Sequence, residues 1–422
     1  MIITNLRKTK ISDSPTIFRA PALSLASQVA GVLQLFALLW RHGPSNATDT
    51  YFYLFNLGNL PVQILIVGVM YPLLLNDSRL TRRGARLFAV GVPASALLAV
   101  LLGTLWLAAN GRMVESLVPV AVLCGLNSLF QVFLWFRAVC AEASGSPHWV
   151  SAIALPANIA ATLVMIFPWP SSTATVIAMM AALTTANAAF AAVAFRMKVG
   201  SEVVELLPEK SGGVRAGSAW FLAKSGVSYG GLMIIQSLSL VLPPSTLTLL
   251  TVPMKIVASV AATFVNAILP RMVHQTAESP AEGRAFLRIL VVWLVPAGIT
   301  VNIALVLAFP NYSLIGIVVA LWLVASACSS VAQRLAFRFL PPSASRITMV
   351  VVPVVVLAVA LSAPLPGFGL IALLAAYATV DALSGLLLLI AMRDRIMTIV
   401  LGLATIALAA IWVSSVLFQY GI

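Results

Sequence analysis

The chain has 422 residues, of which 61% are hydrophobic and only 9% are charged, and its mean hydropathy is +1.04. Soluble domains carry about 25% charged residues, so this chain cannot cover a soluble surface of its size. The composition excludes a soluble enzyme, a secreted disulfide scaffold and a disordered protein, and it predicts an all-α polytopic membrane protein. The formal net charge of +13 fits either nucleic-acid binding or basic residues sorted to one face of a membrane, so the positions of Lys and Arg decide its meaning.

Long apolar runs recur along the whole chain. A bilayer core of about 30 Å needs about 20 apolar helical residues. Runs of this kind predict about 13 transmembrane helices, with 12 to 14 allowed because 149–167 and 347–363 are short. The predicted spans are 18–40, 50–75, 87–109, 117–139, 149–167, 174–195, 219–242, 247–269, 286–309, 314–337, 347–363, 369–391 and 397–418.

The basic residues indicate the orientation of these helices. With the N-terminus in the cytoplasm, 21 of the 25 Lys and Arg residues fall in cytoplasmic loops or helix ends. Arg41 and Arg112 fall on the outer side, and Lys224 and Lys255 fall within helices. This asymmetry follows the positive-inside rule and predicts a multi-pass protein of the bacterial cytoplasmic (inner) membrane. Most of the positive charge therefore encodes topology, and we expect no nucleic-acid partner.

The helix spacing repeats after 198 residues, which places the spans of the first half on those of the second. Six helices per half is an even number, so the two repeats are parallel and related by an axis along the membrane normal. We therefore expect an N-terminal six-helix lobe (1–195), a cytoplasmic linker (196–218), a C-terminal six-helix lobe (219–395) and an extra helix (396–422) around a central cavity.

A polar stripe runs along the predicted second helix. Asp49, Tyr53, Asn56, Asn59 and Gln63 follow one another at steps of three or four, which places them on one face of an α-helix. Such a face is costly in lipid, so it must meet protein or water. Two interpretations stay open: hydrogen bonds between helices, or the lining of a polar cavity that binds a substrate.

The predicted helix 247–269 has a similar face, made of Thr248, Thr251, Lys255, Ser259 and Asn266. An intramembrane lysine costs about 3 kcal/mol on insertion scales, so Lys255 either reaches outward to the interface or serves an anionic ligand in a wet cleft. Gln28 lies on a polar arc of helix 18–40, and Lys224 lies on one in helix 219–242. These four helices hold corresponding places in the two halves, as a central cavity would require.

Two acids are candidates for coupling to an ion. Asp381 lies in the middle of helix 369–391, and Asp49 begins the polar stripe. The alternative for Asp381 is a protonated, hydrogen-bonded structural acid. Four amides, Asn127, Gln131, Asn187 and Asn302, are expected to link helices through hydrogen bonds. The three cysteines lie in apolar runs without metal-ligand spacing and are expected to be buried.

Several chemical motifs are absent from the sequence. No Walker A, GxGxxG or HExxH pattern occurs, and the short outer loops offer few acids. We therefore expect no cofactor, no metal site and no enzymatic activity.

Two segments carry a resemblance to a known family. The stretch 46–61, NATDTYFYLFNLGNLP, resembles the start of the second helix in MviN/MurJ-like and Wzx-like flippases of the multidrug/oligosaccharidyl-lipid/polysaccharide (MOP) exporter superfamily. The segment 267–271, AILPR, is similar to the Leu-Pro step that precedes a basic loop in those families. Two six-helix halves with extra C-terminal helices are similar to that superfamily too.

The resemblance implies a two-lobed transporter that works by alternating access. Its substrate would be a polyprenyl-diphosphate-linked saccharide precursor of cell-surface polysaccharide, with H⁺ or Na⁺ coupling and polymerase or glycosyltransferase partners. The lysines would hold the diphosphate, and the amides would bind sugar hydroxyls. Lipid II flippases look richer in cavity arginine, which favours another precursor here. The alternatives are a lipid II flippase and an ion-coupled MATE-type exporter of small molecules.

Overall fold

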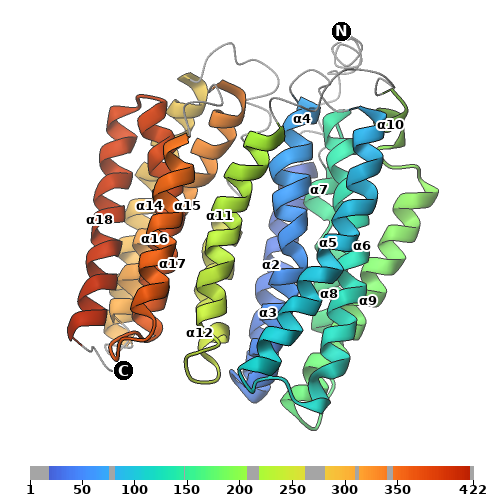
Figure 1. Cartoon of the computed structure of the whole chain (residues 1–422), viewed down its shortest axis with the longest axis horizontal. Coiled ribbons are helices and arrows are strands. Elements are labelled where there is room, and N and C mark those ends of the chain that lie inside the picture. The colour runs from blue at the N-terminus through green and yellow to red at the C-terminus, as the bar shows by residue number, and fades with distance from the viewer. Residues whose placement is uncertain are drawn as a thin grey trace. The chain divides into compact units, whose positions relative to one another are not determined.

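The computed structural model describes residues 19–75, 81–146, 148–206, 218–261, 281–308, 313–339 and 346–418, and within these ranges the secondary structure is helical (Figure 1). The chain divides into two compact units, residues 1–229 and 230–422. Eight helices in the described ranges are long and apolar enough to cross a membrane. The prediction of an all-α, multi-pass membrane protein is confirmed.

Unit 1 contains the helices of the first half and the start of α11. They are α2 (Arg19–His42), α3 (Asn46–Pro61), the π-helix η2 (Val62–Met70), α4 (Tyr71–Leu75), α5 (Arg82–Ala109), the 3₁₀ turn η3 (Glu115–Leu117), α6 (Val118–Ala143), α7 (His148–Ala152), α8 (Leu155–Val164), α9 (Ser172–Arg196), α10 (Ser201–Leu206) and α11 (Ser218–Leu238). In packing order, α3 contacts α5 and α6, α6 contacts α9, and α8 lies between α2 and α9.

Unit 2 begins within α11, at residue 230. Its further helices are α12 (Thr246–Ala261), α14 (Ala281–Ala308), α15 (Ser313–Phe339), α16 (Arg346–Ser362), α17 (Leu370–Ala391) and α18 (Arg395–Phe418). Helix α15 packs against α12, α14, α17 and α18, while α16 packs against α17. Most side chains of α17 are buried, which fits its uniformly apolar sequence.

Two predicted spans are interrupted. The run 149–167 is split into α7 and α8, because Pro156 starts a new helix at its second position and breaks the ladder before it. The run 50–75 is not one α-helix, since η2 follows Pro61 directly. Proline lacks an N–H and its ring crowds the carbonyl of Leu57, which interrupts the α-helical hydrogen bonds at this point.

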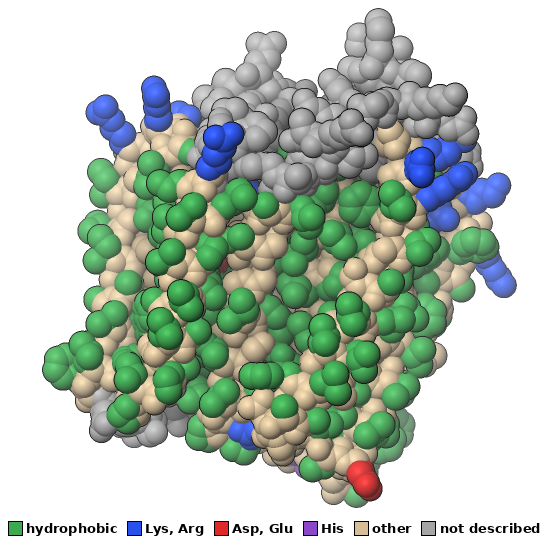
Figure 2. Space-filling view, viewed as in Figure 1, with side chains coloured by type: hydrophobic (Ala, Val, Ile, Leu, Met, Phe, Trp, Pro, Cys, Tyr) green, Lys and Arg blue, Asp and Glu red, His purple; other side chains and the backbone are tan. Residues whose placement is uncertain are grey.

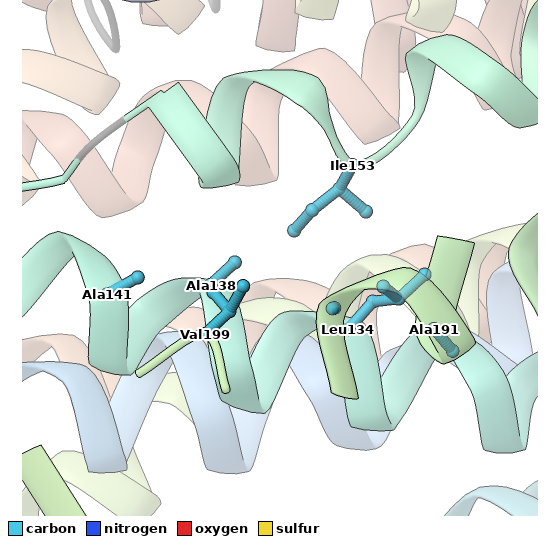
Figure 3. Packing of buried hydrophobic residues seen from close by; sticks show 7 residues of the cluster. Leu134, Ala138, Ala141, Ile153, Ala191 and Val199 are labelled. Atoms are coloured by element: carbon cyan, nitrogen blue, oxygen red, sulfur yellow. The ribbon is translucent and has the colours of Figure 1, made fainter. Parts of the chain in front are cut away.

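Small side chains bring the helices of unit 1 close together. Ala138 and Ala141 of α6, Ala191 of α9 and Ile153 between α7 and α8 belong to one buried cluster with Leu134, Ala194 and Val199 (Figure 3). Small residues let helix backbones approach in a membrane, where packing replaces the hydrophobic effect as the driving force. Cys124, Cys140 and Cys328 are free and buried, as the sequence predicts.

Basic side chains concentrate at one end of the helices in each unit, and apolar side chains cover the helix flanks (Figure 2). In unit 1 the basic end includes Arg82, Arg83, Arg86, Arg196 and Lys198; in unit 2 it includes Arg284, Arg288, Arg346, Arg393 and Arg395. Arg41 and Arg112 lie at the other ends of α2 and α5. Within each unit, this is the pattern of membrane helices that have a basic end.

Candidate functional site

The polar stripe of the first half begins at the N-terminus of α3. The Ser45 side chain accepts a hydrogen bond from the Thr48 backbone N–H, and the Thr48 hydroxyl is bonded to the Ser45 backbone N–H, which forms a capping box. Asp49 lies in the first turn that this cap defines and is 2% exposed. The free N–H groups and the dipole of a helix N-terminus stabilise a carboxylate there.

The remaining members of the stripe differ in burial. Tyr53 is buried, while Asn56, Asn59 and Gln63 are half-buried. The Asn59 amide donates to the Phe55 carbonyl of its own helix at 3.0 Å, which still leaves its carbonyl oxygen as an acceptor. Gln63 belongs to η2, so its direction departs from the α-helical spacing that the sequence assumed. The role of these amides in substrate binding stays a prediction.

Buried polar contacts connect α2 to three other helices of unit 1, α3, α8 and α9. The Gln34 amide lies 3.4 Å from the Tyr51 hydroxyl and 3.5 Å from the Met179 sulfur of α9. On the same helix, the Ser27 carbonyl accepts a hydrogen bond from Asn158 of α8 at 3.3 Å. Gln28, which the sequence selected on this helix, is half-buried. The sequence pattern does not reveal the partners of Gln34.

Asn127 of α6 and Asn187 of α9 form a buried pair. The Asn187 amide donates to the Asn127 side-chain oxygen at 2.8 Å, and each residue is 1% exposed. The predicted interhelical hydrogen bond is therefore confirmed.

Lys224 lies in the part of α11 that belongs to unit 1, and it is 3% exposed. Its neighbour Ser225 packs against Gly68 of η2 so closely that a methyl group on Gly68 would lie 2.1 Å from the Ser225 hydroxyl oxygen. The structure thus brings the helix of the polar stripe against the helix of the buried lysine.

Lys255 lies in α12, in unit 2, and is half-buried. Pro253 lies inside the same helix and, because proline has no N–H, leaves the Leu249 carbonyl without its helical donor. Ser259 is half-buried one turn further along. Asn266 lies outside the described residues, as does the segment 267–271.

Asp381 of α17 lies in a cluster of hydrogen-bond donors from α15 and from α17 itself. The Trp322 indole N–H donates to its carboxylate at 2.9 Å, and the Ser326 hydroxyl bonds to the same group. Two further hydroxyls, from Ser329 and Ser384, donate to the Asp381 backbone carbonyl at 2.9 Å each. The carboxyl group is therefore satisfied by N–H and O–H donors.

A second contact extends this cluster to α11. The Trp322 ring meets Tyr377 edge-on at a centroid distance of 5.3 Å, and the Tyr377 hydroxyl lies 3.3 Å from the Gln236 amide nitrogen. In the part of the chain that the structure describes, no group of three or more His, Cys, Asp or Glu side chains could hold a metal ion.

Solved structures with a similar fold include the lipid II flippase MurJ in an inward closed conformation. The match has a TM-score of 0.56 at 12% sequence identity and covers 95% of this chain and 92% of that one. A mutant of the Vibrio cholerae MATE transporter VcmN matches with a TM-score of 0.49 at 14% identity over 98% of each chain. No protein-family model and no curated protein matches the sequence.

The chain has the MurJ-type fold. At this level of identity the likeness concerns the fold, and the substrate has to be argued from this chain's own residues.

Proposed function

We propose that this protein is a flippase of the bacterial cytoplasmic membrane. Its substrate would be a polyprenyl-diphosphate-linked saccharide precursor of cell-surface polysaccharide, moved from the cytoplasmic to the outer leaflet by alternating access. The observation that carries the proposal is a buried lysine, Lys224, in a chain with the fold of a lipid II flippase. Lysine ammonium groups away from water suit a diphosphate, because charge-assisted hydrogen bonds to phosphate are strong.

The contacts within each unit support two parallel six-helix repeats. In unit 1, Gln34 of α2 contacts Met179 of α9; in unit 2, Gln236 of α11 contacts Tyr377 of α17. Met179 and Tyr377 are related by the 198-residue shift that the helix spacing predicts. The pairs α6–α9 and α15–α17, and α8–α9 and α16–α17, also correspond. From this proposal we expect about 13 membrane helices around a central cavity and an N-terminus in the cytoplasm.

Different side chains would bind the sugar and the coupling ion. Half-buried amides such as Asn56 and Asn59 have both donors and acceptors for saccharide hydroxyls. Asp381, surrounded by donors, suits the uptake and release of a proton better than a metal cation, which needs several oxygen ligands. Polymerases or glycosyltransferases that use the same precursor would be its partners.

Replacement of Lys255 tests the binding role. Lys255→Ala should abolish surface polysaccharide while the protein remains in the membrane, because the diphosphate would lose one of the two lysines, Lys224 and Lys255, proposed to bind it. Lys255→Arg keeps the charge and should retain export, and Lys198→Ala is the matched control because Lys198 is exposed. Wild-type export in Lys255→Ala would contradict the assignment of Lys255.

Reconstitution tests the function itself. Purified protein in liposomes should move a fluorescent polyprenyl-diphosphate-linked saccharide between leaflets, at a rate that a polyprenol without diphosphate does not reach. A deletion strain that keeps its surface polysaccharide but becomes sensitive to small cationic compounds would instead favour a MATE-type exporter.

A further inference from the structure

The π-helix η2 is an unusual element of the membrane domain. It covers nine residues, Val62–Met70, and ends with the Tyr71 N–H bonded to the Ile66 carbonyl five residues earlier. Helices of this type are rare, occur mostly as single turns and are frequent at functional sites. We therefore expect contacts with neighbouring helices to stabilise a π segment of this length.

Two glycines, Gly58 of α3 and Gly68 of η2, pack against serines of two different helices. A methyl group on Gly58 would lie 2.2 Å from the Ser128 hydroxyl of α6, and one on Gly68 would lie 2.1 Å from the Ser225 hydroxyl of α11. Real side chains essentially never approach so closely. At Gly68 the Ser225 Cβ would also lie 2.5 Å away, so rotation of the hydroxyl cannot relieve the clash, whereas at Gly58 the Ser128 Cβ would lie 3.4 Å away, which is an ordinary contact. Position 68 is therefore restricted to glycine by α11.

The π segment changes the relative direction of these two glycines. They are ten residues apart, so an uninterrupted α-helix at about 100° per residue would place them about 80° apart around the axis. A π-helix turns by only about 80° per residue over the seven steps from Pro61 to Gly68. Together with the three α-helical steps from Gly58 to Pro61, this places the two glycines about 140° apart around the helix axis. The π segment thus lets one helix contact α6 on one side and α11 on nearly the opposite side.

The contact at Gly68 bears directly on Lys224. Ser225 follows Lys224 in α11, and both residues are buried. Any shift of α11 that makes room for a side chain at position 68 also moves the Lys224 backbone, since adjacent residues of a helix move together. We infer that Gly68, turned toward α11 by the π segment, is the positioning residue for Lys224. This inference rests on the proposed function of Lys224 in diphosphate binding.

A reporter cysteine tests this positioning without any substrate. Lys224→Cys is placed in a chain whose three native cysteines are replaced by Ala, and its rate of reaction with N-ethylmaleimide is measured in membranes. Gly68→Ala should raise that rate at least fivefold, because α11 moves away from η2. Gly58→Ala, which places a methyl group 2.2 Å from the Ser128 hydroxyl of α6, should leave the rate within twofold.

Relief of the clash provides the second arm. Ser225→Gly removes both side-chain atoms that a methyl group on Gly68 would meet, so the pair Gly68→Ala and Ser225→Gly should return the rate to within twofold of the parent. If Gly68→Ala does not reach the membrane, Ser225→Gly alone should still raise the rate, because it loosens the contact without a clash. The inference is wrong if the rate is unchanged in Gly68→Ala or, where that variant does not reach the membrane, in Ser225→Gly. It is also wrong if Gly68→Ala and Gly58→Ala change the rate equally.

Export assays separate this inference from the proposed function. With native Lys224, Gly68→Ala should reduce export to the level of Lys224→Ala, and the two changes together should reduce it no further. Full export in Lys224→Ala would count against the function assigned to that lysine, whatever the reporter shows. Reduced export in Gly68→Ala with an unchanged reporter rate would count against positioning.

Discussion

Trp322→Phe should weaken unit 2 through the loss of one hydrogen bond. The indole N–H donates to the Asp381 carboxylate at 2.9 Å, and Trp322 is 3% exposed. A phenyl ring can keep the edge-on contact with Tyr377, which has a centroid distance of 5.3 Å. The substitution therefore removes the donor while it preserves most of the aromatic packing.

The size of this effect can be bounded. Hydrogen bonds to charged groups contribute about 1.5–3 kcal/mol in soluble proteins. Interhelical hydrogen bonds in membranes average about 0.6 kcal/mol, with a maximum of about 1.7, because the unfolded chain in the membrane also finds partners. Since the Trp322 contact is short and buried, we expect a coupling free energy of about 1–1.5 kcal/mol between Trp322 and Asp381.

A double-mutant cycle measures this coupling. Trp322→Phe, Asp381→Ala and the double variant are unfolded reversibly in mixed micelles, and the coupling is the departure from additivity. Trp322→Phe in an Asp381→Asn background is the matched control, because the amide keeps an acceptor without the charge. A coupling below about 0.3 kcal/mol would refute the role of this hydrogen bond, since distant sites already differ from additivity by that much.

Four further substitutions test the packing, a helix cap, an ion pair and a turn. Gly385→Ala should cost about 1–3 kcal/mol of unfolding free energy, because its methyl group would lie 2.2 Å from the Ser329 hydroxyl. Ser329→Gly should restore only part of this loss, because the Ser329 Cα would also lie within 2.5 Å of the methyl group. Asp394→Ala should cost about 1 kcal/mol, because the Asp394 carboxylate accepts the backbone N–H of the first turn of α18. Arg288→Ala should cost about 0.5 kcal/mol, because Arg288 is half-exposed and 3.8 Å from Asp394. Gly200→Ala should cost about 1 kcal/mol or more, because Gly200 has a φ of +66°.

Thermal unfolding in detergent measures all of these changes. Full rescue of Gly385→Ala by Ser329→Gly would show that only the serine side chain restricts that position. A larger loss for Arg288→Ala than for Asp394→Ala would contradict the capping explanation. An unchanged melting temperature in Gly200→Ala would mean that the turn before α10 adjusts without strain.

Much of the fold could be predicted because a membrane leaves few alternatives to helices. Runs such as 369–391 and 397–418 correspond closely to α17 and α18, and the boundaries differ by a few residues at most. The interruption at η2 could not be predicted, although Pro61 was visible, since a proline alone does not distinguish a kink from a π segment.

The candidate site was predictable only in its residue types. The sequence singled out Lys224 and Asp381 as costly polar residues in apolar helices. It also named Asn127 and Asn187, with Gln131 and Asn302, as links between helices, but it did not say which of them pair. It did not identify Trp322 as the donor to Asp381, because an indole in an apolar helix looks like an ordinary hydrophobic residue. It also gave no reason to connect Gly68 with Ser225, which are far apart in the sequence.

The sequence by itself determined that the chain is helical, crosses the membrane repeatedly and has one basic side, because each of these depends on composition and local period. The tertiary structure decided which side chains meet. Whether Asp381 finds a donor, and whether Gly68 must be glycine, depends on the rotation of one helix against another. That rotation is set by close packing over the whole helix, and a local pattern of residues does not encode it.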